Sequence, residues 1–453
     1  MKILLYTPPV PKQSIHVDYL ISCEPLELEY LYTVLSPKHA VSFLEKGSRR
    51  LLYEKIKTDR ISMLCISCYI THVPGVLTLV KQLKIDFPSL YIAVGGVYAE
   101  VVPEHFFSPD IDAVIFGNHL AAIVAIADGV AAGMLPDKMD GVAFRTNDFQ
   151  YEPVRTNIQE LPVPDRVLFQ QHPEKYYYMY FKSCASIKTS VGCPGKCTFC
   201  FCRKMNNGMY QARSVEQVIN EIESIATENI FILDDNFLTS ETRLEQFCEA
   251  LESKNIRKKF IVYGTAHFVS THPELMLRLK NNGVSALIVG FESITSEGLE
   301  LINKDASTED NDKTIAICKE LDIELFALFI CEADWHHRDF RALASYIRKK
   351  EIRFATFSTS TIFPETDIAI ELKLKFDIPS LWRYDLLRLH EKPRNIPTAA
   401  YYWWLYMLYL TPLMRFSSFR HILKRYGFWG GLGVAVKSST FGLIYLVKLL
   451  IWK

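Results

Sequence analysis

The stretch Gly192-Cys-Pro-Gly-Lys-Cys-Thr-Phe-Cys200 places three cysteines with the spacing C-x3-C-x2-C directly after an apolar run. Three thiolates this close can occupy one face of a metal centre and leave one position open to another ligand. The interleaved glycine and proline argue against a chance group of buried cysteines. An iron–sulfur cluster with one free iron fits this loop. Zinc also fits, and a structural zinc site would take its fourth ligand from Cys184 or Cys202.

The region around this loop alternates short apolar runs with helix-like segments. Residues 214 and 217, Ser and Gln, are typical of the start of a helix with a capping box. Six such strand–helix units between residues 186 and 370 predict a partial or full βα barrel. The expected strands are residues 187–191, 230–233, 260–264, 286–290, 324–330 and 354–359.

Residues 1–145 show the same alternation, so we expect a separate α/β domain there. Unbroken apolar strands joined by helices predict a parallel sheet covered on both faces, a doubly wound fold that binds ligands at the carboxyl ends of its strands. Residues 146–185 form a connector, because the alternating prolines of Leu161-Pro-Val-Pro-Asp-Arg166 disfavour helix and central strand. The expected strands are residues 2–6, 40–44, 61–67, 90–94 and 113–116.

Charge is distributed unevenly along the 453 residues. The 51 Lys and Arg balance the 51 Asp and Glu, which argues against a dedicated nucleic-acid binder. No acidic residue follows Glu391, however, and residues 392–453 contain nine Lys and Arg. The tail therefore carries +9 and the body −9. The eleven cysteines, an odd number, and the absence of a signal-peptide pattern predict a reduced, cytoplasmic compartment.

Residues 371–453 are expected to be helical. Residues 399–414 are uncharged and rich in Tyr and Trp, and residues 438–447 form a second apolar stretch, but each is shorter than the roughly 20 residues of a membrane span. Aromatic residues beside Lys and Arg favour contact of residues 392–453 with the inner face of the cytoplasmic membrane. The alternative is a helical lid that covers the barrel and packs a hydrophobic substrate.

The motifs occur in an order that resembles the cobalamin-binding radical S-adenosylmethionine (SAM) family. The cysteine loop, with Phe199 before its last cysteine, resembles the signature of that family. The series over residues 1–370 resembles the subgroup that includes anaerobic magnesium-protoporphyrin cyclase and hopanoid methylases. Its other members are Thr7-Pro-Pro9, Val94-Gly-Gly-Val97, Phe116-Gly-Asn118, the connector at 161–166, Arg213-Ser214, Phe231-Ile-Leu-Asp-Asp-Asn-Phe237, Val289-Gly-Phe-Glu-Ser293 and Ile362-Phe-Pro-Glu-Thr366.

This resemblance implies a 4Fe–4S cluster on Cys193, Cys197 and Cys200. Its open iron would chelate SAM, and one electron would cleave SAM to a 5′-deoxyadenosyl radical. The resemblance also implies SAM contacts from Phe199, Arg213, Asp234, Asp235, Glu292 and Ser293. Five of the six have a structural alternative: a core aromatic for Phe199, a helix cap for the two aspartates, a buried salt bridge for Glu292 and a surface ion pair for Arg213.

Cobalamin contacts are implied at the carboxyl ends of the first sheet, by Pro8, Ser67, Gly95, Gly96, Gly117 and Asn118. The family's D-x-H-x-x-G motif is absent after the first strand, and Asn118 stands where the family usually has Glu. We expect His72, which follows the third strand, to be structural rather than an axial ligand. Cys331-Glu-Ala-Asp-Trp-His-His337 replaces the usual glycine-rich turn, and we expect a polar loop there rather than an acid–base site.

The resemblance predicts a radical SAM enzyme that uses cobalamin to methylate a carbon of a hydrophobic, lipid-like or natural-product substrate. An electron donor such as flavodoxin or ferredoxin is expected, and no nucleic acid. The alternatives are ring formation, carbon–carbon coupling or oxidation without methyl transfer. A non-catalytic, zinc-bound scaffold is a third reading. The predicted domains are residues 1–145, 146–185, 186–370 and 371–453.

Overall fold

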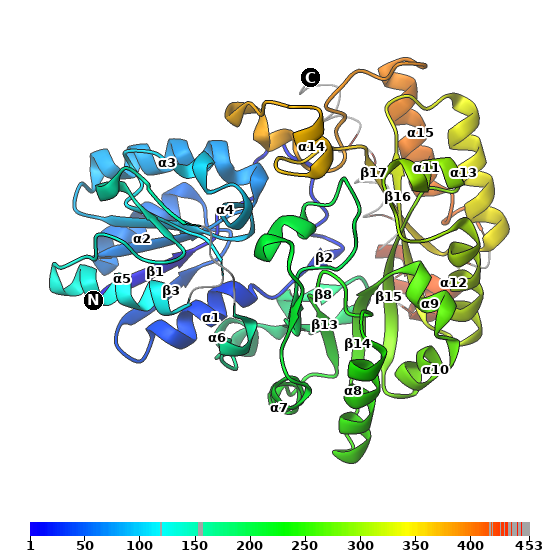
Figure 1. Ribbon diagram of the computed structural model, residues 1–453, viewed down its shortest axis with the longest axis horizontal. Coiled ribbons are helices and arrows are strands. Elements are labelled where there is room, and N and C mark those ends of the chain that lie inside the picture. The colour runs from blue at the N-terminus through cyan, green and yellow to red at the C-terminus, as the bar shows by residue number, and fades with distance from the viewer. Residues whose placement is uncertain are drawn as a thin grey trace.

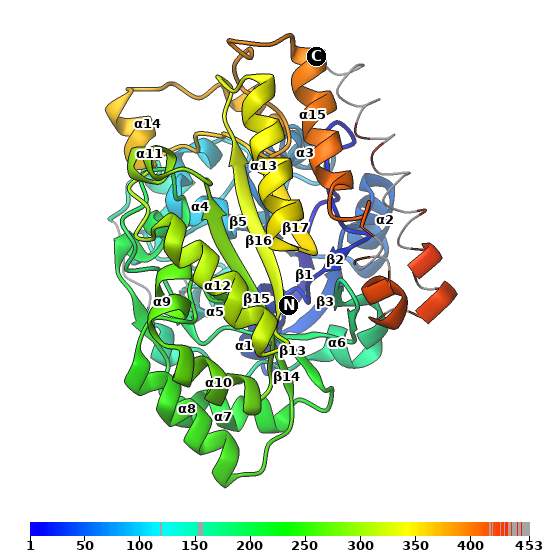
Figure 2. The ribbon, with the colours of Figure 1, turned by 90° about the vertical axis from the view of Figure 1, so that its right-hand side faces the viewer.

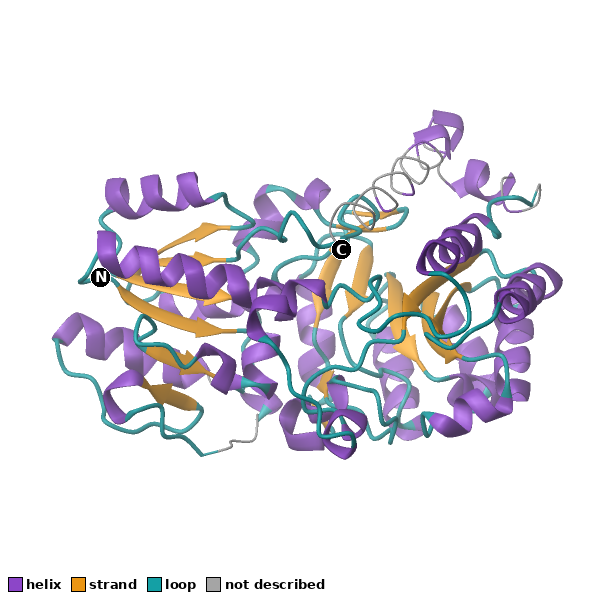
Figure 3. Ribbon diagram, turned by 90° about the horizontal axis from the view of Figure 1, so that it is seen from above, coloured by secondary structure: helices purple, strands orange, loops and turns teal. Residues whose placement is uncertain are grey.

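Two six-stranded sheets stand next to each other in the computed structural model, each flanked by helices (Figures 1 and 3). The structure describes residues 1–117, 120–152, 157–415, 418, 420–425, 427–429, 431–433, 436, 442 and 445. Asn118 lies outside these residues, as does most of the predicted apolar stretch 438–447. The domain boundaries at residues 145, 185 and 370 remain predictions.

The first sheet is doubly wound, as predicted. Its strand order is β3-β1-β4-β5-β6-β7, and all neighbouring strands are parallel except β6 and β7. The order in which strands are added reverses between β1 and β4, because β3 lies on one side of β1 and the later strands lie on the other. Its apolar runs are unbroken because helices cover both faces: α2 and α3 pack on one, α1 and α5 on the other. The strands are β1 (Lys2–Tyr6), β3 (Ala40–Leu44), β4 (Met63–Ser67), β5 (Tyr91–Gly95), β6 (Ala113–Ile115) and β7 (Val142–Phe144). The helices are α1 (Leu26–Leu35), α2 (Arg49–Asp59), α3 (Val73–Asp86), α4 (Val97–Val101) and α5 (Leu120–Ala132).

The second sheet is a partial barrel. Its six parallel strands run in the order β10-β13-β14-β15-β16-β17, and β10 and β17 form two open edges, so the full-barrel reading is wrong. The strands are β10 (Ala185–Ile187), β13 (Asn229–Ile232), β14 (Lys259–Gly264), β15 (Val284–Glu292), β16 (Glu324–Cys331) and β17 (Phe354–Thr359). The helices are α7 (Val215–Ser224), α8 (Glu241–Ser253), α9 (Ala266–Thr271), α10 (Pro273–Asn281), α11 (Ser296–Leu301), α12 (Thr308–Glu320) and α13 (His337–Lys350).

Local sequence explains most of these elements, with one shift. Ser214 caps α7 and forms the predicted capping box with Gln217. The first barrel strand was expected at residues 187–191 but lies at Ala185–Ile187, because Ser190–Val191 leaves the sheet as β11 and pairs with β12 (Gln211–Ala212). A third small sheet joins β2 (Ile21–Ser22), β8 (Tyr177–Tyr178) and β9 (Phe181–Lys182).

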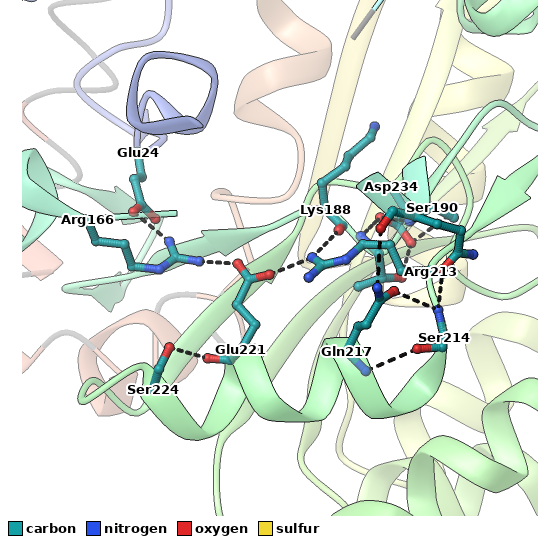
Figure 4. Close-up of polar contacts among 12 residues, drawn as sticks. Glu24, Arg166, Lys188, Ser190, Arg213, Ser214, Gln217, Glu221, Ser224 and Asp234 are labelled. Carbon is teal, nitrogen blue, oxygen red and sulfur yellow. Dashed lines mark hydrogen bonds and ion pairs between the residues drawn. The ribbon is translucent and has the colours of Figure 1, made fainter. Parts of the chain in front are cut away.

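A buried chain of charges joins the two halves (Figure 4). Arg166 of the connector donates to Glu24, which precedes α1, and to Glu221 of α7, each at 2.6 Å. Glu221 also accepts from Arg213, next to β12. All four side chains are buried. The proline-bounded connector, which continues into α6 (Val167–Gln171), therefore carries an ionic clamp between the sheets.

The segment after β17 returns to the first domain. It passes through α14 (Asp367–Glu371) and a 3-10 helix at Ile378–Arg383, whose Leu381 is fully buried against the first sheet's helices. The Ser14 hydroxyl donates to the Trp382 carbonyl at 2.6 Å. We call residues 360–384 the strap. It connects the end of the barrel sheet back to the first domain.

Helix α15 (Thr398–Leu410) packs against α13 and β17, beside the open edge of the barrel (Figure 2). Tyr401, Leu405 and Leu408 are fully buried in the barrel core. The Tyr401 hydroxyl donates to the Cys331 carbonyl at 2.6 Å, and the Tyr409 hydroxyl does so to the Phe357 carbonyl. Residues 399–410 thus form a helix with one face packed into the barrel core, which fits the packing part of the lid alternative, and the membrane contact of residues 392–453 stays a prediction. Within the described residues no helix is long and apolar enough to cross a bilayer.

Candidate functional site

The three-cysteine loop begins at a sharp turn after β11. Gly192 has a φ of +77°, and a Cβ there would lie 2.3 Å from the Met209 carbonyl oxygen. Only glycine fits such a backbone at such a contact. The Asp235 carboxylate accepts the Gly192 N–H at 2.9 Å and so fixes where the loop leaves the sheet.

The thiols of this loop lie within electrostatic range of one another. Cys193 Sγ accepts the Gly195 N–H at 3.4 Å. A hydrogen bond from the Cys202 thiol, with the backbone N–H groups of Arg203 and Cys202, lowers the pKa of Cys200 to about 7. Burial raises the pKa of Cys193 and Cys197. N–H donors that stabilise a thiolate are what an iron–sulfur ligand loop requires.

The loop suits an iron–sulfur cluster because its ligand atoms are thiol sulfurs, although these thiols are not arranged as a preformed metal site. Among the described residues no group of three or more His, Cys, Asp or Glu side chains is already drawn together as a metal site. The described thiols Cys193, Cys197 and Cys200 are half-buried and near one another, which suits a soft, sulfide-containing centre.

A buried ion pair lies beside these thiols. Lys304 Nζ donates to Glu292 Oε1 at 2.9 Å, and each side chain is only 11% exposed. Although burial opposes it, the charges of Glu292, Cys197 and Cys200 raise the pKa of Lys304. Glu292 ends β15 with a φ of +60°, an unusual backbone for a non-glycine residue. Gly290 leaves the room for this pair, since a Cβ there would lie 2.0 Å from Glu292 Oε1 and 2.9 Å from Lys304 Nζ.

Two neighbouring segments hold the loop against this pair. The Thr198 N–H donates to the Ile302 carbonyl at 3.1 Å, and the Asn303 amide donates to the Lys196 carbonyl at 2.9 Å. Asp367, at the start of α14, pairs with both Arg203 and Lys204 at the far end of the loop. Residues 302–304 are therefore fixed where the Lys304 cation faces the cysteines.

The predicted SAM contacts fall into two groups. Asp235, Glu292 and half-buried Phe199 lie at or beside the cysteine loop. Asp234 is buried, and its carboxylate accepts four hydrogen bonds from the N–H and hydroxyl groups of Thr189 and Ser190. That carboxylate holds the start of the loop.

Arg213 and Ser293 also have structural partners. Arg213 is buried in the charge chain with Glu221, so its ion pair is not on the surface as the structural alternative had it. The Ser293 hydroxyl accepts the Thr295 N–H ahead of α11. The roles of these two residues toward SAM remain predictions.

On the first sheet, the predicted cobalamin contacts gather at one edge. Ser67 and Gly95 are register partners at the ends of β4 and β5. Gly96 has a φ of +102°, and a Cβ there would lie 2.9 Å from the Ser67 hydroxyl. Close packing of the two strands therefore explains this glycine without a ligand. Gly117 also has a positive φ of +72°, and Pro8, two residues past β1, is buried.

The His72 imidazole has a structural hydrogen bond, as expected. Its Nδ1 accepts the Tyr69 N–H at 3.2 Å, and burial lowers its pKa to about 4. A neutral imidazole that accepts through Nδ1 carries its proton on Nε2. Nε2 is buried without a hydrogen-bond partner among the described residues. In this tautomer it has no lone pair for a metal.

The two candidate sites face each other. Tyr98 of α4, which follows the carboxyl end of β5, stacks on Phe201 of the cysteine loop, with ring centroids 6.1 Å apart and planes 15° apart. Phe201 also contacts Phe363, which contacts Tyr384 of the returning strap. An aromatic layer thus joins the carboxyl edge of the first sheet to the cysteine loop.

Sequence reasoning missed several groups here. Burial raises the pKa of Glu27, and a hydrogen bond from the Ser67 hydroxyl partly offsets this rise. The negative charge of Glu27 in turn raises the pKa of Tyr69. Burial raises the pKa of Glu332 at the end of β16, inside the loop that departs from the family pattern. The departure from the family pattern at residues 331–337 is a signal in the sequence that could have pointed to Glu332, whereas Lys304 and Glu27 have no such local signal. His336 caps α13 and His337 accepts from Trp404, so the polar-loop reading fits both.

Known proteins resemble this chain in sequence. The radical SAM superfamily model matches residues 187–347. Hopanoid C-3 methylase of Methylococcus capsulatus is 25% identical over 365 residues, which are 79% of this chain and 70% of that protein. An anaerobic magnesium-protoporphyrin IX monomethyl ester cyclase of Rubrivivax gelatinosus is 23% identical over 356 residues, 75% of this chain and 62% of that protein.

Solved structures share the fold. OxsB, a cobalamin-dependent SAM radical enzyme solved with aqua-cobalamin and SAM, has a TM-score of 0.63 at 16% identity. The match covers 82% of this chain and 55% of OxsB, so the chain spans about half of that protein. The radical SAM methyltransferase TsrM of Kitasatospora setae, solved with cobalamin and a 4Fe–4S cluster, has a TM-score of 0.62 at 17% identity and covers 82% of this chain and 77% of TsrM.

Proposed function

This chain belongs to the radical SAM superfamily through residues 187–347 and resembles the B12-binding subgroup, and we propose that it is a cobalamin-dependent methyltransferase acting on a carbon atom of a hydrophobic substrate. One observation carries the proposal. The cysteine loop at the carboxyl edge of the partial barrel faces the carboxyl edge of the doubly wound sheet, through Phe201 and Tyr98. A radical site and a methyl-carrying site are then neighbours.

In this proposal Cys193, Cys197 and Cys200 hold the 4Fe–4S cluster. When bound, the cluster supplies one electron for reductive cleavage of SAM. Lys304 holds a positive charge beside the thiolates and is itself oriented by Glu292. The aromatic side chains of Phe201 and Phe363 contact each other beside the loop and would help to keep water from a radical formed there.

Cobalamin is assigned to the edge formed by Ser67, Gly95 and the turn after β4. This edge adjoins the switch point between β1 and β4, where doubly wound domains bind ligands. When bound, cobalamin supplies methyl transfer. His72 stays a structural residue and is not assigned as a cobalamin ligand.

One similar protein, a hopanoid C-3 methylase, supports the proposal of a hydrophobic substrate. Cyclases among the relatives keep a second reaction open, ring formation without methyl transfer, with the same loop and the same SAM cleavage. In either reaction an electron donor such as flavodoxin or ferredoxin is required. The zinc-scaffold reading is the least supported, because the thiol loop lies at the carboxyl edge of a barrel that matches a catalytic superfamily.

The test separates these readings. The full chain is purified and reconstituted without oxygen, and cobalamin, iron and zinc are counted per chain. It is then given SAM carrying a deuterated methyl group, reductant and a hopanoid-type lipid extract. Methyl transfer predicts cobalamin near one per chain and a lipid product heavier by the labelled methyl group. A product without the label supports ring formation, and zinc without iron supports the scaffold.

A further inference from the structure

Large apolar side chains are exposed near the carboxyl end of the described chain. Trp429 is 80% exposed and Phe428 66%. Single exposed apolar residues are ordinary on protein surfaces, but a group confined to one short segment marks an interaction site. The group lies within residues 414–436 and consists of Met414, Phe428, Trp429, Leu432 and Val436. We call the described residues of this stretch, 414–415, 418, 420–425, 427–429, 431–433 and 436, the tail segment; its helical parts are drawn in red in Figure 2.

Cations accompany these side chains. Arg420 and Lys424, one helical turn apart, are both exposed, and neither has an acidic partner in the described part of the chain. No Asp or Glu follows Glu391 anywhere in the sequence. The tail segment therefore presents positive charge that nothing within it neutralises.

The tail segment is anchored to the barrel at its base. His421 Nε2 lies 2.6 Å from an oxygen of buried Glu324, the first residue of β16, and the Tyr180 hydroxyl donates to the same oxygen at 2.9 Å. The Arg415 guanidinium pairs with Glu351 at 2.6 Å. These contacts hold Arg415 and His421 against the barrel, a few residues before the exposed aromatic pair.

A cavity of about 310 Å³ opens beside this anchor. Its lining is rich in cations, among them Lys319, Lys350, Arg353, Arg420 and Lys424. Lys319 pairs with Glu351, Lys350 with Asp312 and Arg353 with Glu324, so among the described residues Arg420 and Lys424 are the lining cations without an acidic partner. Such a cavity fits the phosphate of a lipid headgroup.

We propose that the tail segment docks the protein on an anionic phospholipid bilayer. Phe428 and Trp429 enter the interfacial layer, where aromatic rings are favoured. Arg420 and Lys424 contact headgroup phosphates, with the cavity as the recess for one headgroup. This inference narrows the sequence prediction for residues 392–453: α15 packs one face on the barrel, and the proposed membrane surface begins at residue 414. It does not depend on the reaction proposed above.

The test is flotation of the full chain with vesicles. Vesicles of phosphatidylcholine alone are compared with vesicles containing phosphatidylglycerol, at low and high salt. The double variant Phe428→Ser/Trp429→Ser removes the aromatic pair, and Arg420→Glu/Lys424→Glu reverses the charge. We expect binding to the anionic vesicles only, weakened by salt, and lowered at least about tenfold by either double variant.

Matched controls lie elsewhere on the surface. Ile85→Ser/Met134→Ser removes exposed apolar side chains, and Lys57→Glu/Lys81→Glu reverses exposed charges. Both controls should bind as the parent chain does, and thermal melting checks that all variants are folded. Equal binding by the tail variants, or no binding to anionic vesicles, overturns the proposal. A dimer in solution that Phe428→Ser/Trp429→Ser dissociates, without vesicle binding, would assign the surface to a second copy of the chain.

Discussion

Lys304 is the side chain whose position says most about the cysteine loop. A cation held beside three thiolates favours added negative charge, and therefore stabilises the reduced form of a cluster bound there. Its neighbours fix it: Glu292 binds its ammonium group and Gly290 leaves it room. Lys304 is thus a positioning residue for the electron-transfer step.

Replacing Lys304 by Met should lower the midpoint potential of the reconstituted cluster. The loss of one close positive charge predicts a shift on the order of 50–100 mV to more negative values. The potential is read by redox titration followed by electron paramagnetic resonance. Lys196→Met removes an exposed charge from the cysteine loop itself and should shift the potential much less. An unchanged potential in Lys304→Met would contradict the assignment.

One buried histidine predicts how stability depends on pH. Burial lowers the pKa of His72 to about 4, below the roughly 6.5 of an unfolded histidine. Between pH 6.5 and 4 the unfolded chain therefore binds more protons at this position, and the free energy of unfolding falls as pH falls. The slope from His72 is up to about 1.4 kcal/mol per pH unit.

Denaturant unfolding at several pH values measures this slope. His72→Gln should remove its share between pH 6.5 and 4, while His16→Gln, at an exposed position, should leave the slope unchanged. A slope in His72→Gln equal to that of the parent chain would show that His72 is not buried as neutral imidazole.

Among the elements, the connector holds the halves together through one side chain. Arg166 bridges Glu24 and Glu221, and all three are buried. Removing one member of a buried ionic group leaves an uncompensated charge. Pairs on the surface are screened by solvent and contribute far less.

Arg166→Met should lower the free energy of unfolding by about 3–5 kcal/mol, measured by denaturant titration. The matched control is the exposed pair of Lys138 and Glu152. Lys138→Met should leave the transition where it is. If both variants unfold at the same denaturant concentration as the parent chain, the buried charge chain does not hold the halves together.

The elements were predictable where one apolar pattern decided them. Five of the six strands of the first sheet lie within two residues of their expected positions, because burial on both faces requires unbroken apolar runs. The antiparallel edge strand β7 was not predicted. The first barrel strand was shifted, because Ser190–Val191 pairs with β12, a contact that local pattern does not encode. For the tail helix α15 the sequence left two readings open, because uncharged aromatic residues suit a bilayer surface and the open edge of a barrel equally well.

Across the whole molecule, the two sheets meet by their carboxyl edges. Each edge was predictable from its own strand pattern, and the cysteine loop from its spacing. The sequence did not predict that the two edges face each other, because this arrangement depends on contacts between distant residues. These contacts are the Tyr98–Phe201 stack, the Arg166 clamp and the strap around Leu381. The same limit hid Lys304, which reaches the cysteines only once residues 302–304 lie against the loop.

Formation of 5′-deoxyadenosine is the measurement that most directly tests radical SAM chemistry at this loop. The reconstituted full chain is incubated with SAM and dithionite without oxygen, beside Cys197→Ala and Cys248→Ala, a buried cysteine of α8 remote in sequence from the loop. We expect 5′-deoxyadenosine from the parent chain and from Cys248→Ala, and none from Cys197→Ala. No 5′-deoxyadenosine from a parent chain that carries four irons, or equal amounts from Cys197→Ala, would contradict the assignment of the loop.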